Sequence, residues 1–149
     1  MDRDAEAEAT TFSERPQDAR QDVTMLTPEQ ARQQLDAGDV LLIDVGEEWQ
    51  LRERGTISGA RNISHDKIGL KTGAEDERRD PNLQDRNQKI ILTCGGGGKA
   101  MRAAGSLQQM GFTDVAVIQG GCRGWQTAGF VLEPYPASNS DTPSSRSDK

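Results

Sequence analysis

The feature that most constrains the fold is a stretch in which an apolar run meets a cysteine and four consecutive glycines. Residues 89–94 read Lys-Ile-Ile-Leu-Thr-Cys, and Gly95–Gly98 separate them from a helical pattern that begins near Lys99. Apolar and β-branched residues favour a buried strand, whereas a glycine run suits a backbone that curls tightly and exposes its N–H groups. The stretch therefore predicts a strand, a turn able to bind an anion, and a helix N-terminus.

Cys94 is the candidate nucleophile because it stands where this strand ends and the glycine turn begins. The backbone N–H groups of Gly95, Gly96, Gly97 and Gly98, the positive end of the helix dipole and the cationic Lys99 would all stabilise a thiolate or a bound oxyanion. A cysteine that ends an apolar strand is often only a small buried hydrophobic residue. The glycines and the lysine favour the functional interpretation here.

Composition limits the other classes of function. The chain of 149 residues is 33% hydrophobic and carries a net charge of −6, which favours one domain with a modest core and polar tails. The acidic balance argues against nonspecific binding to nucleic acid or to an anionic membrane. Two cysteines and one histidine form neither a disulfide framework nor a zinc cluster, so we expect no metal. The function favoured below implies no organic cofactor either. We find no apolar run long enough for a signal peptide or a membrane span, and we expect a cytoplasmic location.

The order of segments predicts one domain between two tails. Residues 1–22 are polar and acidic and 137–149 are rich in serine, so we expect disordered tails there and a domain over 24–136. Thr27 is placed to cap a helix in which Pro28 takes the first position and Gln30 completes a capping box. That helix is predicted to run to about residue 37.

Nearly continuous apolar runs at residues 40–44, 90–93 and 115–118 are typical of strands that are buried on both faces. They alternate with helical patterns at 47–54 and 100–110. This alternation predicts an α/β fold in which helices cover both faces of a parallel sheet. Ligands of such sheets bind beyond the carboxyl ends of the strands, which is where Cys94 lies.

Three further features of the sequence concern the core and the surface of the domain. Trp49 is expected in the core rather than on a binding surface. The single histidine, His65, is a possible general base, but a surface or capping role is the favoured interpretation because it stands in a polar turn. Residues 69–88 are polar and are expected to form a long surface segment that could carry partner contacts.

Taken together, several pieces resemble a single-domain rhodanese, a sulfurtransferase, over roughly residues 26–136. The pieces occur in this order and spacing: residues 41–45 with 47–49, residues 59–63, the cysteine loop, residues 111–115 and residues 120–125. The resemblance implies a single rhodanese-like α/β domain. It also implies that the loop cysteine takes sulfane sulfur from a donor such as thiosulfate, becomes a persulfide, and passes the sulfur to a thiol or to cyanide.

The resemblance makes Cys94 the catalytic residue and assigns Gly95–Gly98 and Lys99 to substrate binding. Two departures from the family pattern concern charge: Lys99 stands where the family loop commonly has an arginine, and Gly46 stands where an arginine often follows Asp-Val. A lysine keeps the charge but loses the bidentate grip of a guanidinium on a multi-oxygen anion. The implied partners are a small sulfur-containing anion or persulfide donor, a thiol or cyanide acceptor, and a sulfur-relay protein.

Two other functions stay open at this point. One is a persulfide or polysulfide carrier that binds sulfur for a partner enzyme with little turnover. The other is a cysteine-dependent oxyanion reductase or phosphatase, which is less favoured because the loop has the short length seen in sulfurtransferases. Cys122 is expected at the same sheet edge as Cys94, where it could act as a resolving thiol. A packing role is the favoured interpretation of Cys122.

Overall fold

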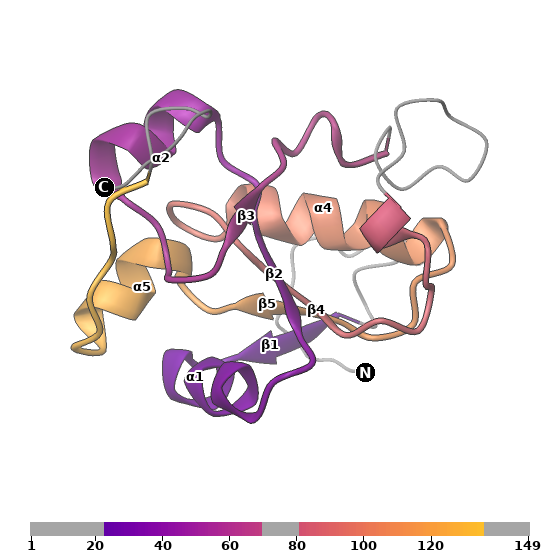
Figure 1. The fold of residues 1–149 in the computed structure, drawn as a ribbon, viewed down its shortest axis with the longest axis horizontal. Helices are drawn as coiled ribbons and strands as arrows, with labels where there is room; N and C mark the ends of the chain where they lie inside the picture. The colour runs from indigo at the N-terminus through magenta and orange to yellow at the C-terminus, as the bar shows by residue number, and fades with distance from the viewer. Residues whose placement is uncertain (1–22, 70–80, 136–149) are drawn as a thin grey trace, which may run out of the picture.

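A parallel sheet of five strands forms the centre of the fold (Figure 1). The computed structural model describes residues 23–69 and 81–135. The strand order across the sheet is β1-β5-β4-β2-β3. The strands are β1 (Thr24–Leu26), β2 (Leu41–Asp44), β3 (Arg61–Asn62), β4 (Ile90–Thr93) and β5 (Val115–Ile118).

The register of the three central strands brings their carboxyl ends to one edge of the sheet. Asp44, the last residue of β2, pairs with Thr93, the last residue of β4. On the other side of β4, Leu92 pairs with Val117 of β5. Side chains and loops that follow these three strands therefore meet at the same edge.

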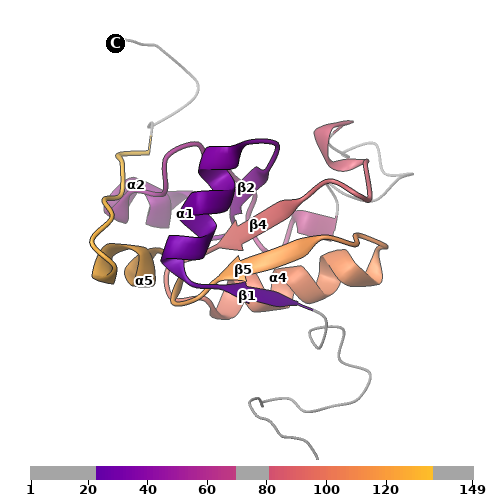
Figure 2. The ribbon, with the colours of Figure 1, turned by 90° about the horizontal axis from the view of Figure 1, so that it is seen from below.

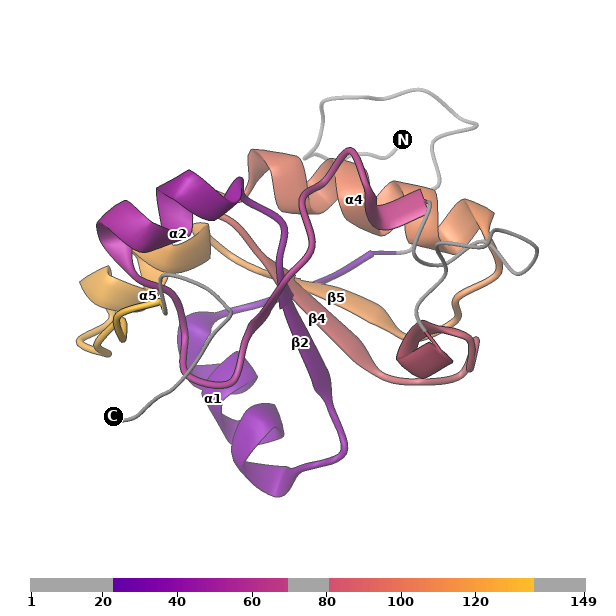
Figure 3. The same ribbon diagram turned by 45° about the horizontal axis from the view of Figure 1, so that its top comes forward.

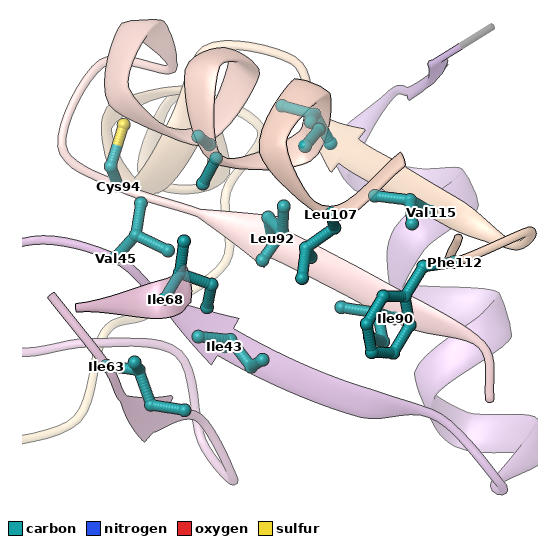
Figure 4. Close-up of a cluster of buried hydrophobic side chains, with 14 of the residues drawn as sticks. Ile43, Val45, Ile63, Ile68, Ile90, Leu92, Cys94, Leu107, Phe112 and Val115 are labelled. Carbon is teal, nitrogen blue, oxygen red and sulfur yellow. The ribbon is translucent and has the colours of Figure 1, made fainter. Parts of the chain in front are cut away.

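Helices cover both faces of the sheet, as the sequence predicts (Figures 2 and 3). On one face lies α4 (Gly98–Gln109), and on the other lie α1 (Pro28–Ala37) and α5 (Gly121–Thr127). The core is divided accordingly into two clusters. The cluster on the α4 face, shown in Figure 4, includes Ile43, Ile90, Leu92, Cys94 and Leu107. The cluster on the opposite face includes Leu42, Ile91, Ile118, Cys122 and Trp125.

The predicted capping box at the start of α1 is confirmed. The Gln30 N–H donates to Thr27 Oγ1 at 3.1 Å, and the Thr27 N–H donates to Gln30 Oε1 at 2.9 Å. These bonds satisfy two backbone donors that the first turn of a helix leaves without partners, and Pro28 needs none. The helix ends at Ala37, before Gly38, as predicted.

Two sequence interpretations of the fold were wrong or incomplete. The strand β1 was missed because its three residues are too few to show a pattern, although it pairs in parallel with β5 at the sheet edge. Trp49 is 58% exposed rather than part of the core. It belongs to the short helix α2 (Glu48–Arg54), which buries Leu51. Residues two apart on a helix point in nearly opposite directions, so burial of Leu51 turns Trp49 outward.

The predicted tails at 1–22 and 137–149 lie outside the described residues, and so do residues 70–80 of the predicted surface segment. The part of that segment that is described contains a short 3₁₀ helix, η2 (Pro81–Leu83). Leu83 is fully buried and belongs to the α4-side cluster. The second half of the segment is therefore anchored to the core.

Candidate active site

Cys94 lies directly after β4, where its side chain meets the first turn of α4 (Figure 4). The side chain is 3% exposed and packs with the α4-side cluster. The Gly97 N–H donates to Cys94 Sγ at 3.0 Å. A backbone donor aimed at the sulfur stabilises a negative charge on it, because the donor is fixed before the charge appears.

The glycine turn curls around this sulfur as the sequence predicts. Gly97 has φ of +107° and caps α4, so the turn needs a left-handed residue at the position whose N–H reaches Cys94. Within the described part of the chain, the Gly95 and Gly96 N–H groups have no hydrogen-bond acceptor. These two donors and the N-terminus of the twelve-residue α4 make the turn suited to an anion.

The N-terminus of α5 holds the turn in place from the other side. The Cys122 N–H donates to the Cys94 carbonyl at 2.7 Å, and the Arg123 N–H donates to the Gly95 carbonyl at 3.0 Å. Gly121 makes this contact possible, because a Cβ on it would lie 2.3 Å from the Cys94 carbonyl oxygen. The carbonyls of Cys94 and Gly95 thus point toward α5, and the N–H groups of the peptides that they belong to, those of Gly95 and Gly96, point the other way.

A buried ion pair lies beneath the turn, between Asp44 at the end of β2 and Arg54 at the end of α2. Arg54 Nη1 is 3.0 Å from Asp44 Oδ2, and Arg54 Nη2 is 3.2 Å from Asp44 Oδ1. Asp44 is fully buried and also accepts from the Thr56 hydroxyl and the Gly46 N–H. Burial alone would lower the pKa of Arg54, but the hydrogen bond to Asp44 and its charge raise the pKa overall. The guanidinium therefore stays charged beside the turn.

Cys122 lies in this ion-pair environment and not beside the glycine turn's donors. Its Sγ is 3.4 Å from Arg54 Nη1 and 3.7 Å from both Asp44 Oδ2 and Thr93 Oγ1. Burial, followed by the charge of Asp44, raises the pKa of the Cys122 thiol from 9.0 to about 11. Cys122 is therefore a neutral thiol at physiological pH.

The two cysteines are free thiols on opposite sides of β4. Side chains alternate along a strand, so Cys94 shares the α4 face with Leu92, whereas Thr93 turns toward Cys122 on the other face. A direct attack by Cys122 on sulfur carried by Cys94 would have to pass around the end of the strand. The resolving role stays a prediction, and this placement weighs against it.

Lys99 and His65 were also named from the sequence as candidate functional residues. Lys99 is the second residue of α4 and is half-buried, with no ion pair among the residues that the structure describes. His65 is half-buried in the turn after β3, and its backbone N–H donates to the Val45 carbonyl. Within residues 23–69 and 81–135 the imidazole of His65 makes no hydrogen bond, so its contacts give no support to a general-base role.

The sequence interpretation missed Asp44, Arg54 and Arg123. Arg123 is exposed, and its Nη1 lies 3.5 Å from the position that a Cβ on Gly96 would occupy. The position of Asp44 at the end of a buried strand could have indicated a buried carboxylate, and buried carboxylates need a charged or hydrogen-bonding partner. The identity of the partner depended on how α2 folds back onto the sheet, which spacing in the sequence does not give.

Within residues 23–69 and 81–135, no group of three or more His, Cys, Asp or Glu side chains is arranged to hold a metal ion. In the same residues, every helix is too short or too polar to cross a membrane.

A family model, the Rhodanese-like domain, matches residues 27–128. The chain belongs to the rhodanese-like domain family. Thiosulfate sulfurtransferase GlpE of Actinobacillus succinogenes is 29% identical to this domain over 110 residues, which cover 74% of this chain and 90% of GlpE. The match supports membership of a sulfurtransferase family, as the sequence pattern predicted.

Solved structures share the fold of this rhodanese-like domain. A Rhodopseudomonas palustris protein of unknown function, titled a possible tyrosine phosphatase, gives a TM-score of 0.71 at 24% identity and covers 85% of this chain and 100% of its own. The human single-domain sulfurtransferase TSTD1 gives a TM-score of 0.61 at 20% identity and covers 70% of this chain and 96% of its own. At these identities the likeness shows the fold alone.

The contact between α5 and the turn yields a first prediction. Gly121→Ala should destabilise the domain by more than about 2 kcal/mol, because the added Cβ overlaps the Cys94 carbonyl and the left-handed backbone disfavours alanine. Gly129→Ala is the matched control, since Gly129 also has a positive φ but nothing lies within 4 Å of its Cβ position. Urea unfolding measures both variants. Equal losses of stability in the two variants would show that the turn moves away from the added Cβ at no cost in free energy, and would contradict a close fixed contact with α5.

The environment of Cys122 yields a second prediction. A pKa of about 11 leaves roughly one Cys122 in a thousand as thiolate at pH 8, about a hundredfold less than a thiol with a pKa of 9.0. Cys122 should therefore resist iodoacetamide in the folded protein and react normally in denaturant, as peptide mapping can measure. Because the folded-state pKa is raised, the stabilisation by the neutral thiol is present below pH 9 and is lost as pH rises toward 11. Rapid alkylation of Cys122 in the folded protein at pH 8 would contradict this assignment.

Proposed function

We propose that this rhodanese-like domain is a sulfurtransferase that moves sulfane sulfur through a persulfide on Cys94. The observation that carries the proposal is the hydrogen bond from the Gly97 N–H to Cys94 Sγ, in a turn where the Gly95 and Gly96 N–H groups have no acceptor among the described residues. That arrangement stabilises a thiolate before the reaction and an anionic sulfur after it. Family membership supports the same reaction class.

The proposed reaction has two displacements at sulfur. The Cys94 thiolate attacks the sulfane sulfur of thiosulfate, a bond forms between the two sulfurs, and the sulfur–sulfur bond of the donor breaks. Sulfite leaves with the electron pair of the broken bond. A thiolate or cyanide acceptor then attacks the outer sulfur of the persulfide, and Cys94 leaves as a thiolate. The charges balance in both steps, and the cycle needs no external oxidant or reductant.

The turn supplies what the persulfide requires. The outer sulfur of a persulfide anion carries negative charge, and the Gly95 and Gly96 N–H groups are available to it. The dipole of α4 and the charge of Lys99 add to this stabilisation. We propose, on the same reasoning, that the acceptor approaches from the exposed side of the turn, where Gly96 and Gly98 face solvent.

A nucleophile that works as a free thiolate needs a reducing compartment. Both cysteines of this domain are free, so we propose a cytoplasmic location. A sulfur-relay protein carrying a persulfide or an acceptor thiol is the proposed macromolecular partner. A small persulfide and a protein persulfide both present the same terminal sulfur atom. The turn would therefore accept sulfur from either donor in the same way.

The third prediction tests the nucleophile. After incubation with thiosulfate, polysulfide or glutathione persulfide, the intact mass of the wild type should increase by one sulfur atom, and Cys94→Ser should gain none. Cys122→Ser is the matched control because it removes the other thiol and keeps the turn. Added cyanide should then restore the original mass and yield thiocyanate.

Three results would contradict the proposal in different ways. Undiminished sulfur uptake by Cys94→Ser would remove Cys94 from the reaction. Uptake of one sulfur by the wild type without release to cyanide or to a thiol would indicate the carrier function in place of turnover. Consumption of an oxyanion such as arsenate coupled to a thiol, with no sulfur uptake, would indicate a reductase.

The fourth prediction concerns Lys99. Its ammonium group is partly exposed and should contribute about 0.5–1 kcal/mol to the binding of an anionic donor, so Lys99→Ala should raise the donor KM roughly two- to fivefold. Arg102→Ala, which removes an exposed cation from the next turn of α4, is the control. Steady-state kinetics at several salt concentrations measure both. An unchanged KM in Lys99→Ala would assign donor binding to the backbone and to other cations.

A further inference from the structure

A second hollow of the domain lies at the amino ends of the strands, away from the glycine turn. It has a volume of about 460 Å³ and lies among the loops that lead into β2, β4 and β5. In Figure 2 the loops before β4 and β5 stand at the far end of the sheet from α5, the helix that contacts the turn. A volume of this size is typical of a small-molecule site. We call this hollow the amino-edge pocket, and its polar lining includes Gln34, Asp39, Asp85, Gln88, Lys89 and Asp114.

Hydrogen bonds between neighbouring loops hold the walls of the amino-edge pocket in place. The Ile90 N–H donates to the Asp114 carbonyl at 2.9 Å and joins the loops before β4 and β5. Gln88 Nε2 donates to the Asp39 carbonyl at 3.3 Å and to the Lys89 carbonyl at 3.1 Å, which joins the loops before β2 and β4. The pocket is thus formed before a ligand binds, and this lowers the entropic cost of binding.

The lining of the pocket carries an excess of negative charge. Asp39, Asp85 and Asp114 bring three carboxylates against the single ammonium group of Lys89. Lys89 Nζ lies 3.4 Å from Asp114 Oδ1. Asp85 accepts from the Asn87 N–H at 2.9 Å, but among the described residues neither Asp85 nor Asp39 has a cationic partner. Two carboxylates of the pocket are therefore left for a cation from outside the domain.

Gln34 of α1 adds an acceptor that lacks a donor. Its side chain belongs to the lining of the pocket, and its Oε1 is buried with no hydrogen-bond partner in the described structure. A buried acceptor without a partner costs free energy, and a donor that reaches it removes this cost. An N–H group of a ligand in the pocket would satisfy Gln34 Oε1. A carboxylate-rich pocket with an unsatisfied amide oxygen thus favours a ligand that is both cationic and a hydrogen-bond donor.

The arrangement of the carboxylates distinguishes an organic cation from a metal ion. Within residues 23–69 and 81–135, no three His, Cys, Asp or Glu side chains are arranged to hold a metal ion, so the three carboxylates do not converge on one point. Two ammonium groups joined by an alkyl chain can meet separate carboxylates, and each brings three N–H donors. We infer that the amino-edge pocket binds a small organic cation with two or more amino groups, a diamine or polyamine. This site is separate from the proposed sulfur transfer on Cys94.

The fifth prediction is that the full chain binds putrescine and spermidine in a calorimetric titration at low ionic strength. Asp39→Asn and Asp85→Asn should each weaken binding roughly two- to fivefold, because each removes one exposed ion pair with the ligand. Butylamine, which has one ammonium group, should bind more weakly than putrescine, and added salt should weaken both. Asp36→Asn is the matched control, since Asp36 is an exposed carboxylate of α1 that pairs with Arg32 outside the pocket.

Gln34→Met provides a second test that does not depend on charge. It removes the unsatisfied acceptor and keeps a side chain of similar length, so the variant without ligand should unfold at the wild-type temperature or above it. Its affinity for putrescine should nevertheless fall at least about twofold, because the ligand loses an acceptor. A lower unfolding temperature with unchanged affinity for putrescine would show that Gln34 is only structural and would overturn its assignment to the site.

Three further results would overturn the inference as a whole. One is the absence of saturable binding of putrescine and spermidine. Another is an equal loss of affinity in Asp36→Asn and Asp39→Asn, which would indicate nonspecific attraction of amines to an acidic chain. The third is binding of Mg²⁺ that Asp39→Asn and Asp85→Asn abolish, with no binding of either amine, which would indicate a metal site. Each result is independent of whether Cys94 takes up sulfur, so the two proposals fail separately.

Discussion

The hydrogen bond from the Cys122 N–H to the Cys94 carbonyl is the contact on which the site depends. It joins the residue after β4 to the N-terminus of α5 and, with the bond from the Arg123 N–H to the Gly95 carbonyl, holds both carbonyls toward α5. The N–H groups of Gly95 and Gly96 point the other way, and the Gly97 N–H donates to Cys94 Sγ. The parallel register of the sheet brings Asp44 to the same edge, so one backbone arrangement positions both the thiol and the ion pair.

The two cysteines lie at the same edge of the sheet but on opposite faces, and each face gives its thiol a different environment. Cys94 accepts a hydrogen bond from the Gly97 N–H and lies at the N-terminus of α4. Cys122 meets a buried carboxylate and an apolar cluster, which keep its thiol protonated. The alternation of side chains along β4 thus gives the two thiols different surroundings, and only those of Cys94 fit the nucleophile that we propose. Arg54 lies between these environments and donates to both the carboxylate and Cys122.

Local signals carried most of what the sequence predicted correctly. The capping box at Thr27, the buried runs of β2, β4 and β5, and the cysteine–glycine turn depend on residues close together in the chain. The prediction for Trp49 failed because the orientation of a seven-residue helix is set by a single buried leucine. Arg54 was overlooked because its place beside the turn depends on a carboxylate ten positions away and on the missing side chain of Gly46, an arrangement that only the folded chain reveals.

The central claim is that the glycine turn receives a sulfur atom on Cys94. A crystal structure of the protein after reaction with thiosulfate tests it most directly. We expect one additional sulfur bonded to Cys94 Sγ, within hydrogen-bonding distance of the N–H groups of Gly95, Gly96 or Gly97. An unmodified Cys94 in crystals whose protein has gained sulfur, or an added sulfur that points away from these N–H groups, would contradict the account.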